Sequence, residues 1–147
     1  MAQELKGVFA ANAETLLHGD LHTGSVMVRG ASAVAIDPEF AIYGPMGFDV
    51  GMLIANFLMA FHAQSGHEDA PGARDGYRGW ILGVAAEVWT SFAAEFAHLW
   101  RTERRGMLYP AALFEDQGQP LAAEAALTRR LRAVWTDAVG FCGIEMH

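Results

Sequence analysis

The sequence predicts a mainly α-helical domain that contains one short β-hairpin. Apolar residues recur at helical spacing over several long segments, and a single pair of short β-prone runs flanks a glycine-containing turn. The chain has 147 residues, of which 52% are hydrophobic. That length is enough for one domain with its own core and too short for two.

The N-terminal part of the chain is predicted to form a helix, a loop and the hairpin. Residues 2–15 have apolar side chains at helical spacing, and the glycines and small polar residues of 17–25 break that pattern. The β-prone runs 26–28 and 33–36 flank the turn 29–32. The apolar positions of the first helix are Leu5, Val8, Phe9, Ala13 and Leu16.

The remainder of the chain is predicted to be helical with polar connections. A loop at 37–47 holds two prolines, and it leads into a strongly apolar helix at 48–64 that we expect to be central to the core. The last helix contains two glycines, around which we expect it to be loosened. The other segments are a polar connection at 65–75, a long helix at 77–104, an irregular stretch at 106–120 and a closing helix at 121–146.

The long helix carries an apolar stripe that we expect to lie in the core. Three basic residues, Arg101, Arg104 and Arg105, stand at its C-terminal end, where they complement the helix dipole rather than form an anion site. The residues of the stripe are Trp80, Val84, Val88, Phe92, Phe96 and Trp100.

Composition excludes several classes of protein. Seventeen acidic residues against ten Lys and Arg give a formal net charge of −7, the opposite of the balance expected for nucleic-acid binding. Cys142 is the only cysteine, so we expect no internal disulfide and no cysteine-based zinc site, and we expect this side chain to be buried.

The longest apolar stretch, 51–61, is shorter than the roughly 20 residues of a membrane span. With no apolar signal core in the first residues, a cytoplasmic protein without a membrane partner is expected.

Four polar residues around the hairpin are predicted to share one site. If the turn centres near Ala31, then Ser25 and Asp37 lie opposite each other at the open end of the hairpin. Asp20 lies on the loop before the first strand, and Glu39 follows Asp37 by two residues. Three neighbouring carboxylates repel one another unless a cation compensates, and Mg²⁺ prefers oxygen ligands. Such a group of carboxylates is what phosphoryl transfer requires.

The motifs around this site resemble those of the 5-methylthioribose kinases, in the aminoglycoside and choline kinase branch of the protein-kinase-like superfamily. The loop 18–22 reads His-Gly-Asp-Leu-His rather than the His-Arg-Asp of protein kinases. Ser25 and Glu39 stand where most relatives in that branch have Asn and Asp. These two residues narrow the resemblance to the 5-methylthioribose kinases. The implied fold is the C-terminal lobe of a protein-kinase-like fold. Further similar segments are 23–25, 37–41, 44–51, 100–104, 114–118 and 140–141.

The resemblance implies a role for each residue of the predicted site. Asp20 would be the catalytic base and would contact the sugar hydroxyl, while His18 and Asp49 would give structural support. Ser25 is either a further metal ligand or a tie within the loop. The family transfers the ATP γ-phosphate to the 1-hydroxyl of 5-methylthioribose for methionine salvage, and it is expected to form homodimers. The nucleotide would be contacted by Asp37, Pro38 and Glu39, with Mg²⁺ held by the two carboxylates.

The resemblance also implies a division of the chain. Residues 1–147 would be one kinase C-terminal lobe, with a catalytic and metal-binding segment at 18–51 and a helical subdomain at 52–147. Kinases of this superfamily hold ATP between two lobes, and the first lobe supplies a lysine. Lys6 is the only lysine here, and no glycine-rich phosphate loop is present. We therefore expect the N-terminal ATP-binding lobe to be absent and the isolated chain to have little or no kinase activity.

Other interpretations remain open. One is a kinase for another small hydroxylated substrate, such as an aminoglycoside, choline or homoserine, although Ser25 and Glu39 count against it. Another is a non-catalytic binding or dimerisation module derived from such a kinase. His18 and His22 have the spacing of two zinc ligands on a helix, but Gly19 and the loop around it argue against a helix there.

Overall fold

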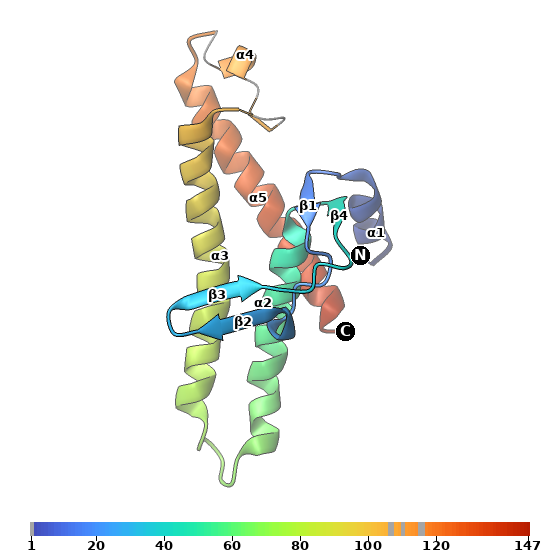
Figure 1. Cartoon of the computed structure of the whole chain (residues 1–147), viewed down its shortest axis with the longest axis vertical. Helices are drawn as coiled ribbons and strands as arrows, with labels where there is room; N and C mark the ends of the chain where they lie inside the picture. The colour runs from blue at the N-terminus through green and yellow to red at the C-terminus, as the bar shows by residue number, and fades with distance from the viewer. Residues whose placement is uncertain (1, 106–107, 110, 115–116) are drawn as a thin grey trace.

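A computed structural model describes residues 2–105, 108–109, 111–114 and 117–147 of the chain. Three long helices dominate it, and two small sheets lie beside them (Figure 1). The mainly α fold with a hairpin is therefore confirmed. In chain order the elements are α1 (Ala2–Ala11), β1 (Thr15–Leu17), η1 (Thr23–Ser25), β2 (Val26–Arg29), β3 (Ser32–Ala35), β4 (Ile42–Gly44), α2 (Gly47–Ala63), η2 (Gln64–His67), α3 (Asp75–Glu103), α4 (Ala111–Phe114) and α5 (Pro120–Glu145).

The helix α2 is the centre of the fold, because it packs against both α5 and α3. The sequence predicted this position from the apolar character of the segment. Cys142 is buried in the same core, as predicted, and burial raises the pKa of its thiol. The buried residues of this core are Val50, Ile54, Ala55, Ala138 and Cys142.

Two glycines let α2 and α5 approach until their backbones touch. A Cβ atom on Gly51 would lie 2.4 Å from the carbonyl oxygen of Ala138, and one on Gly47 would lie 2.6 Å from that of Val134. Both distances are shorter than any Cβ contact that can be accommodated without movement. The glycines at the start of α2 therefore set the spacing of the two helices.

A second apolar cluster lies where the C-terminal end of α3 meets the N-terminal half of α5. Its buried residues are Trp100, Tyr109, Phe114, Ala123 and Leu127.

The apolar stripe predicted along α3 lies only partly in the core. Trp100 is buried, but Trp80 at the other end of the helix is 57% exposed and stacks on Tyr77, with ring centroids 5.4 Å apart. The prediction for Trp80 was wrong because α5 runs beside only part of α3 (Figure 1).

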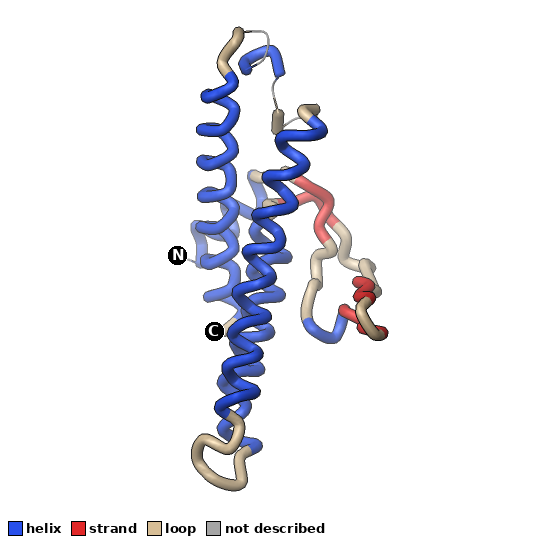
Figure 2. Tube along the Cα trace, turned by 90° about the vertical axis from the view of Figure 1, so that its left-hand side faces the viewer, coloured by secondary structure: helices blue, strands red, loops and turns tan. Residues whose placement is uncertain are grey.

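The strands form two separate antiparallel pairs on one side of the helices (Figure 2). The pair β2–β3 is the predicted hairpin. The pair β1–β4, in which Leu16 faces Tyr43, was not predicted. The predicted end of the first helix was also wrong, because α1 ends at Ala11 rather than at residue 15. Leu16 belongs to β1, where the backbone is paired with β4 instead of forming helical bonds.

The hairpin register differs by one residue from the prediction. Arg29 pairs with Ser32, so the turn consists of Gly30 and Ala31. Ser25 is therefore opposite Ile36, whose N–H donates to the Ser25 carbonyl at 2.9 Å. Asp37 lies one position beyond this pair and has already left the sheet.

The C-terminal helix is more regular than predicted, because α5 runs unbroken to Glu145 through both of its glycines. The short helix α4 lies within the stretch that was predicted to be irregular. Among the helices of the described residues, none combines the length and the apolar character that a membrane span requires.

Candidate active site

The loop that carries Asp20 is held by a carboxylate from the first turn of α2. Asp49 accepts hydrogen bonds from two consecutive backbone N–H groups, that of His18 at 2.6 Å and that of Gly19 at 3.1 Å. One carboxylate thereby satisfies two donors that the loop would otherwise leave without a partner. Asp49 thus ties the start of the loop to the scaffold helix.

The His18 ring links this loop to the strand that precedes Asp37. Its Nε2 donates to the carbonyl oxygen of Ile36 at 2.8 Å, and its Nδ1 accepts from the N–H of Asp20 at 3.3 Å. This pair of bonds corresponds to a neutral imidazole that carries its proton on Nε2. His18 therefore joins the backbone at Asp20 to the backbone next to Asp37.

Gly19 brings the two segments into backbone contact. Its φ is +84°, and a Cβ atom there would lie 2.2 Å from the carbonyl oxygen of Phe40. Only glycine permits both this conformation and this approach. We call residues 18–25 and 36–41 the site loops, and the contact at Gly19 packs one against the other.

Ser25 closes the first site loop from within. Its Oγ donates to the carbonyl oxygen of Asp20 at 3.0 Å, and the residue is only 5% exposed. Of the two roles left open by the sequence, a tie within the loop accounts for this hydrogen bond. The low exposure of Ser25 limits access of a metal ion to its hydroxyl, and the metal-ligand role stays a prediction.

Asp37 and Glu39 lie on the second site loop, and both are exposed. Asp37 adopts a left-handed backbone conformation with φ of 66°, one of only two non-glycine residues with positive φ among those described. Such strain is concentrated at ligand-binding and catalytic positions. The turn continues with the N–H of Ala41 donating to the carbonyl oxygen of Pro38 at 3.1 Å.

The donor set can be compared with the needs of Mg²⁺. Among the described residues, no three His, Cys, Asp or Glu side chains gather closely enough to form a metal site by themselves. The three carboxylates expected around the hairpin mouth therefore do not form a three-ligand cluster. Mg²⁺ in nucleotide sites is commonly held by one or two carboxylates together with phosphate oxygens. The exposed pair Asp37 and Glu39 fits that requirement.

A partly buried ion pair between Glu14 and Arg130 supports the segment next to the site loops, and the sequence gave no reason to expect it. Glu14 accepts from Arg130 of α5 at 2.6 Å and from the N–H of Met46, just before α2, at 3.1 Å. The N–H of Glu14 donates to Gly44 in β4. Burial, and then the charge of Glu14, raise the pKa of the neighbouring Asp137. The pair β1–β4, which brackets both site loops, is thus attached to α5.

Comparison with known proteins identifies the family. The sequence model of the phosphotransferase enzyme family matches residues 1–107. The chain belongs to the phosphotransferase enzyme family. The resemblance to methylthioribose kinases, inferred from the motifs, is confirmed by several relatives with that name.

These relatives match nearly the whole chain. Methylthioribose kinase 1 of Oryza sativa subsp. japonica is 47% identical over 145 residues, which are 97% of this chain and 33% of the relative. The enzyme of Escherichia coli O45:K1 (strain S88) is 34% identical over 147 residues, 100% of this chain and 35% of the relative. That of Geobacillus kaustophilus is 38% identical over 146 residues, 99% of this chain and 31% of the relative. The chain spans about a third of the length of the relatives it matches.

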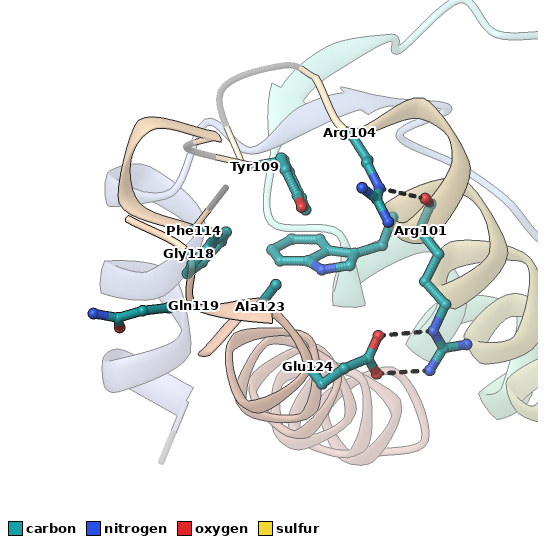
Figure 3. A pocket seen from close by; sticks show the side chains of 9 residues that line it. Arg101, Arg104, Tyr109, Phe114, Gly118, Gln119, Ala123 and Glu124 are labelled. Carbon is teal, nitrogen blue, oxygen red and sulfur yellow. Dashed lines mark hydrogen bonds and ion pairs between the residues drawn. The ribbon is translucent and has the colours of Figure 1, made fainter. Parts of the chain in front are cut away.

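A pocket of about 380 Å³ lies at the C-terminal end of α3 (Figure 3). Arg101 on its wall forms two hydrogen bonds to Glu124, at 3.0 and 2.9 Å, and Arg104 donates from Nε to the carbonyl oxygen of Arg101. The Arg104 bond to a carbonyl oxygen of the last helical turn agrees with the prediction that the arginines complement the helix dipole, whereas Arg101 pairs with a carboxylate of α5 instead. Glu115 and Asp116 of the nearby motif lie outside the described residues.

Proposed function

We propose that this chain provides the catalytic and metal-binding residues of a kinase that transfers the γ-phosphate of ATP to the 1-hydroxyl of 5-methylthioribose. The observation that carries the proposal is the match to methylthioribose kinases along almost the full chain, including both site loops. The structure adds support, because the loop of Asp20 is packed against the loop of Asp37 and Glu39 through Gly19.

Asp20 is the proposed catalytic base. In phosphoryl transfer a carboxylate orients the attacking hydroxyl and accepts its proton. The backbone of Asp20 is fixed on both sides, by His18 at its N–H and by Ser25 at its carbonyl, while its carboxylate remains accessible. A fixed backbone with an accessible carboxylate suits a group that must meet a substrate hydroxyl.

Asp37, Pro38 and Glu39 are the proposed contacts to the nucleotide. Asp37 and Glu39 would hold Mg²⁺, which, when bound, neutralises charge on the phosphates during transfer. The left-handed backbone at Asp37 directs the chain out of strand β3 and into the exposed turn that carries Glu39. The protein thereby presents two carboxylates on a short, defined segment.

On its own, the 147-residue chain is proposed to have little or no kinase activity. Its only lysine, Lys6, lies on α1 beside Phe9, Phe48 and Phe141 in an apolar groove, and it is not among the residues of the site loops. Positioning groups for the phosphates can account for many orders of magnitude in rate. Appreciable ATP-dependent phosphorylation of methylthioribose by the purified chain would contradict this part of the proposal.

The proposed reaction can be tested in a chimera. The residues of Oryza sativa methylthioribose kinase 1 that this chain matches would be replaced by the chain, and phosphorylation of methylthioribose, an aminoglycoside, choline and homoserine would be followed by ³¹P NMR. We expect a phosphate ester only with methylthioribose. Asp20→Asn should lower the rate by about 10²–10⁴-fold, the range for loss of a general base. Phosphorylation of another substrate in preference to methylthioribose would refute the assignment.

A further inference from the structure

His22 stands close to Asp20, and one of its ring nitrogens is committed to the backbone. Its Nδ1 accepts the N–H of Gly24 at 3.0 Å, a bond that caps the short helix η1. A neutral imidazole that accepts at Nδ1 carries its proton on Nε2. His22 therefore has a hydrogen-bond donor at Nε2 that the cap does not use.

That donor lies next to the carboxylate of the proposed catalytic base. The distance from His22 Nε2 to Asp20 Oδ2 is 3.7 Å. This is longer than a hydrogen bond, and a small rotation of either side chain would close the gap. Within the described part of the chain, no other side chain forms an ion pair or hydrogen bond with the Asp20 carboxylate.

Everything in Asp20 except its side chain is already held. Its N–H is bound by His18, and its carbonyl oxygen accepts from the Ser25 hydroxyl at 3.0 Å and from the His22 N–H at 3.1 Å. What the loop leaves undetermined is the rotation of the carboxylate about Cα–Cβ. The side-chain torsions of Asp20 are thus the only part of its conformation that the hydrogen bonds to its backbone leave unfixed.

We propose that His22 is a positioning residue that sets the orientation of the Asp20 carboxylate through Nε2–H. The two ring nitrogens then have separate tasks: Nδ1 caps the loop at Gly24, and Nε2 orients Asp20. The purpose of that orientation, to face a substrate hydroxyl, rests on the proposed kinase function. The orientation itself does not, and it can be measured in the chain without turnover.

Two substitutions separate the tasks. In His22→Asn, the side-chain oxygen reaches about as far as Nδ1 and preserves the cap, but nothing reaches Asp20. In His22→Gln, the longer amide reaches about as far as Nε2 and preserves the donor. NMR of the 147-residue protein would report both tasks, through the three-bond couplings to Asp20 Cγ, which give its rotamer populations, and through the amide shift of Gly24.

The expected pattern is a single Asp20 rotamer in the wild type and in His22→Gln, and averaged couplings in His22→Asn with the Gly24 amide unchanged. A role confined to the loop would shift the Gly24 amide in His22→Gln and leave the Asp20 couplings unchanged in both variants. The proposal is overturned by averaged Asp20 couplings in the wild type, or by unchanged couplings in His22→Asn. Long-range ¹⁵N spectra give a check that needs no variant, because a His22 ring protonated only on Nδ1 would also overturn it.

None of these outcomes depends on catalysis, so the two proposals can fail separately. A chimera that is inactive on methylthioribose, together with the expected NMR pattern, would reject the proposed substrate and keep the role of His22. An active chimera with unchanged Asp20 couplings in His22→Asn would do the reverse.

Discussion

The helical scaffold and the site loops of this molecule are held together by different means. In the scaffold, α2 and α5 touch backbone to backbone at Gly51, and buried apolar side chains surround the contact. The hairpin between the site loops has exposed apolar residues, among them Val28 at 71% exposed and Val34 at 60%. The site loops themselves depend on a few hydrogen bonds centred on Asp49 and His18.

This difference teaches where each kind of substitution should act. Packing is shared among many atoms, so a defect in the scaffold should lower the stability of the whole domain. A two-stranded hairpin with little burial is marginal by itself, so a lost hydrogen bond near it should open that region first. Suitable substitutions should therefore break one region while leaving the other intact.

The largest effect is expected from Gly51→Ala in α2. Its new Cβ would meet the Ala138 carbonyl oxygen at 2.4 Å, so the helices must separate. We expect a loss of about 2–3 kcal/mol in the free energy of unfolding, measured by urea denaturation. Gly83→Ala in α3 is the matched control, because its Cβ would meet nothing within 4 Å. It should be stabilising by about 0.5–1 kcal/mol. Equal effects of the two substitutions would contradict the packing account.

Asp49→Asn should mainly affect the site loops. The amide would turn its NH₂ group towards one of the two backbone N–H groups that the carboxylate now accepts. We expect a loss of about 2 kcal/mol, seen in hydrogen exchange as faster exchange of the amides of His18 and Gly19. The amides in the middle of α2 should keep more of their protection. The exposed Asp69→Asn serves as the control, and uniform loss of protection in α2 and the loop would argue against separate regions.

Breaking the ion pair between Glu14 and Arg130 should lower the stability of the domain by an intermediate amount. Arg130→Met removes the partner of the partly buried Glu14, and we expect a loss of about 1–2 kcal/mol by urea denaturation. Arg101→Met breaks the exposed pair with Glu124 and should leave the midpoint of urea denaturation almost unchanged, because solvent screens the two charges. An equal loss of stability in Arg101→Met and Arg130→Met would show that burial is not what makes the Glu14–Arg130 pair stabilising.

The smallest effect concerns the pH dependence contributed by Asp137. Burial and then Glu14 raise the pKa of Asp137 in the folded state, so the folded protein binds its proton more tightly than the unfolded chain does. The contribution of Asp137 to stability is therefore greatest below its ordinary pKa of 3.8 and declines as the pH rises through the raised folded value. At pH 7, Asp137→Asn should stabilise by about 0.3 kcal/mol after allowance for solvent screening. The gain should shrink as the pH falls, and a gain that grows on acidification would show the opposite shift.

The same contrast explains what could be predicted from the sequence. The position of α2 and the existence of the hairpin follow from local patterns, because apolar periodicity and a glycine-containing turn are properties of neighbouring residues. The pair β1–β4 has three residues on each side, too few to establish alternation, and its partners are far apart in the chain. The helix predicted for residues 2–15 therefore absorbed a strand that only tertiary pairing reveals.

The site was predictable where chemistry is carried by motifs. Asp20, Asp37 and Glu39 could be singled out because carboxylates in that order match phosphoryl-transfer chemistry, although whether they act in that way is still a prediction. The contribution of Glu14 could not be anticipated, since Arg130 is 116 positions away and neither residue has a local signature. His22 was also missed: the sequence analysis considered its spacing to His18 only as a zinc pattern, which the loop around Gly19 argued against, and the structure places its ring beside Asp20.

We propose that Asp37 and Glu39 form a preformed half-site for a Mg²⁺-bound nucleotide on this chain. Calorimetric titration of the folded 147-residue protein with ATP, with and without Mg²⁺, tests it most directly, with Asp37→Ala as control. We expect saturable binding that requires Mg²⁺ and is lost in Asp37→Ala while the variant remains folded. Binding that is the same in Asp37→Ala, or no binding by a protein shown to be folded, would contradict the claim.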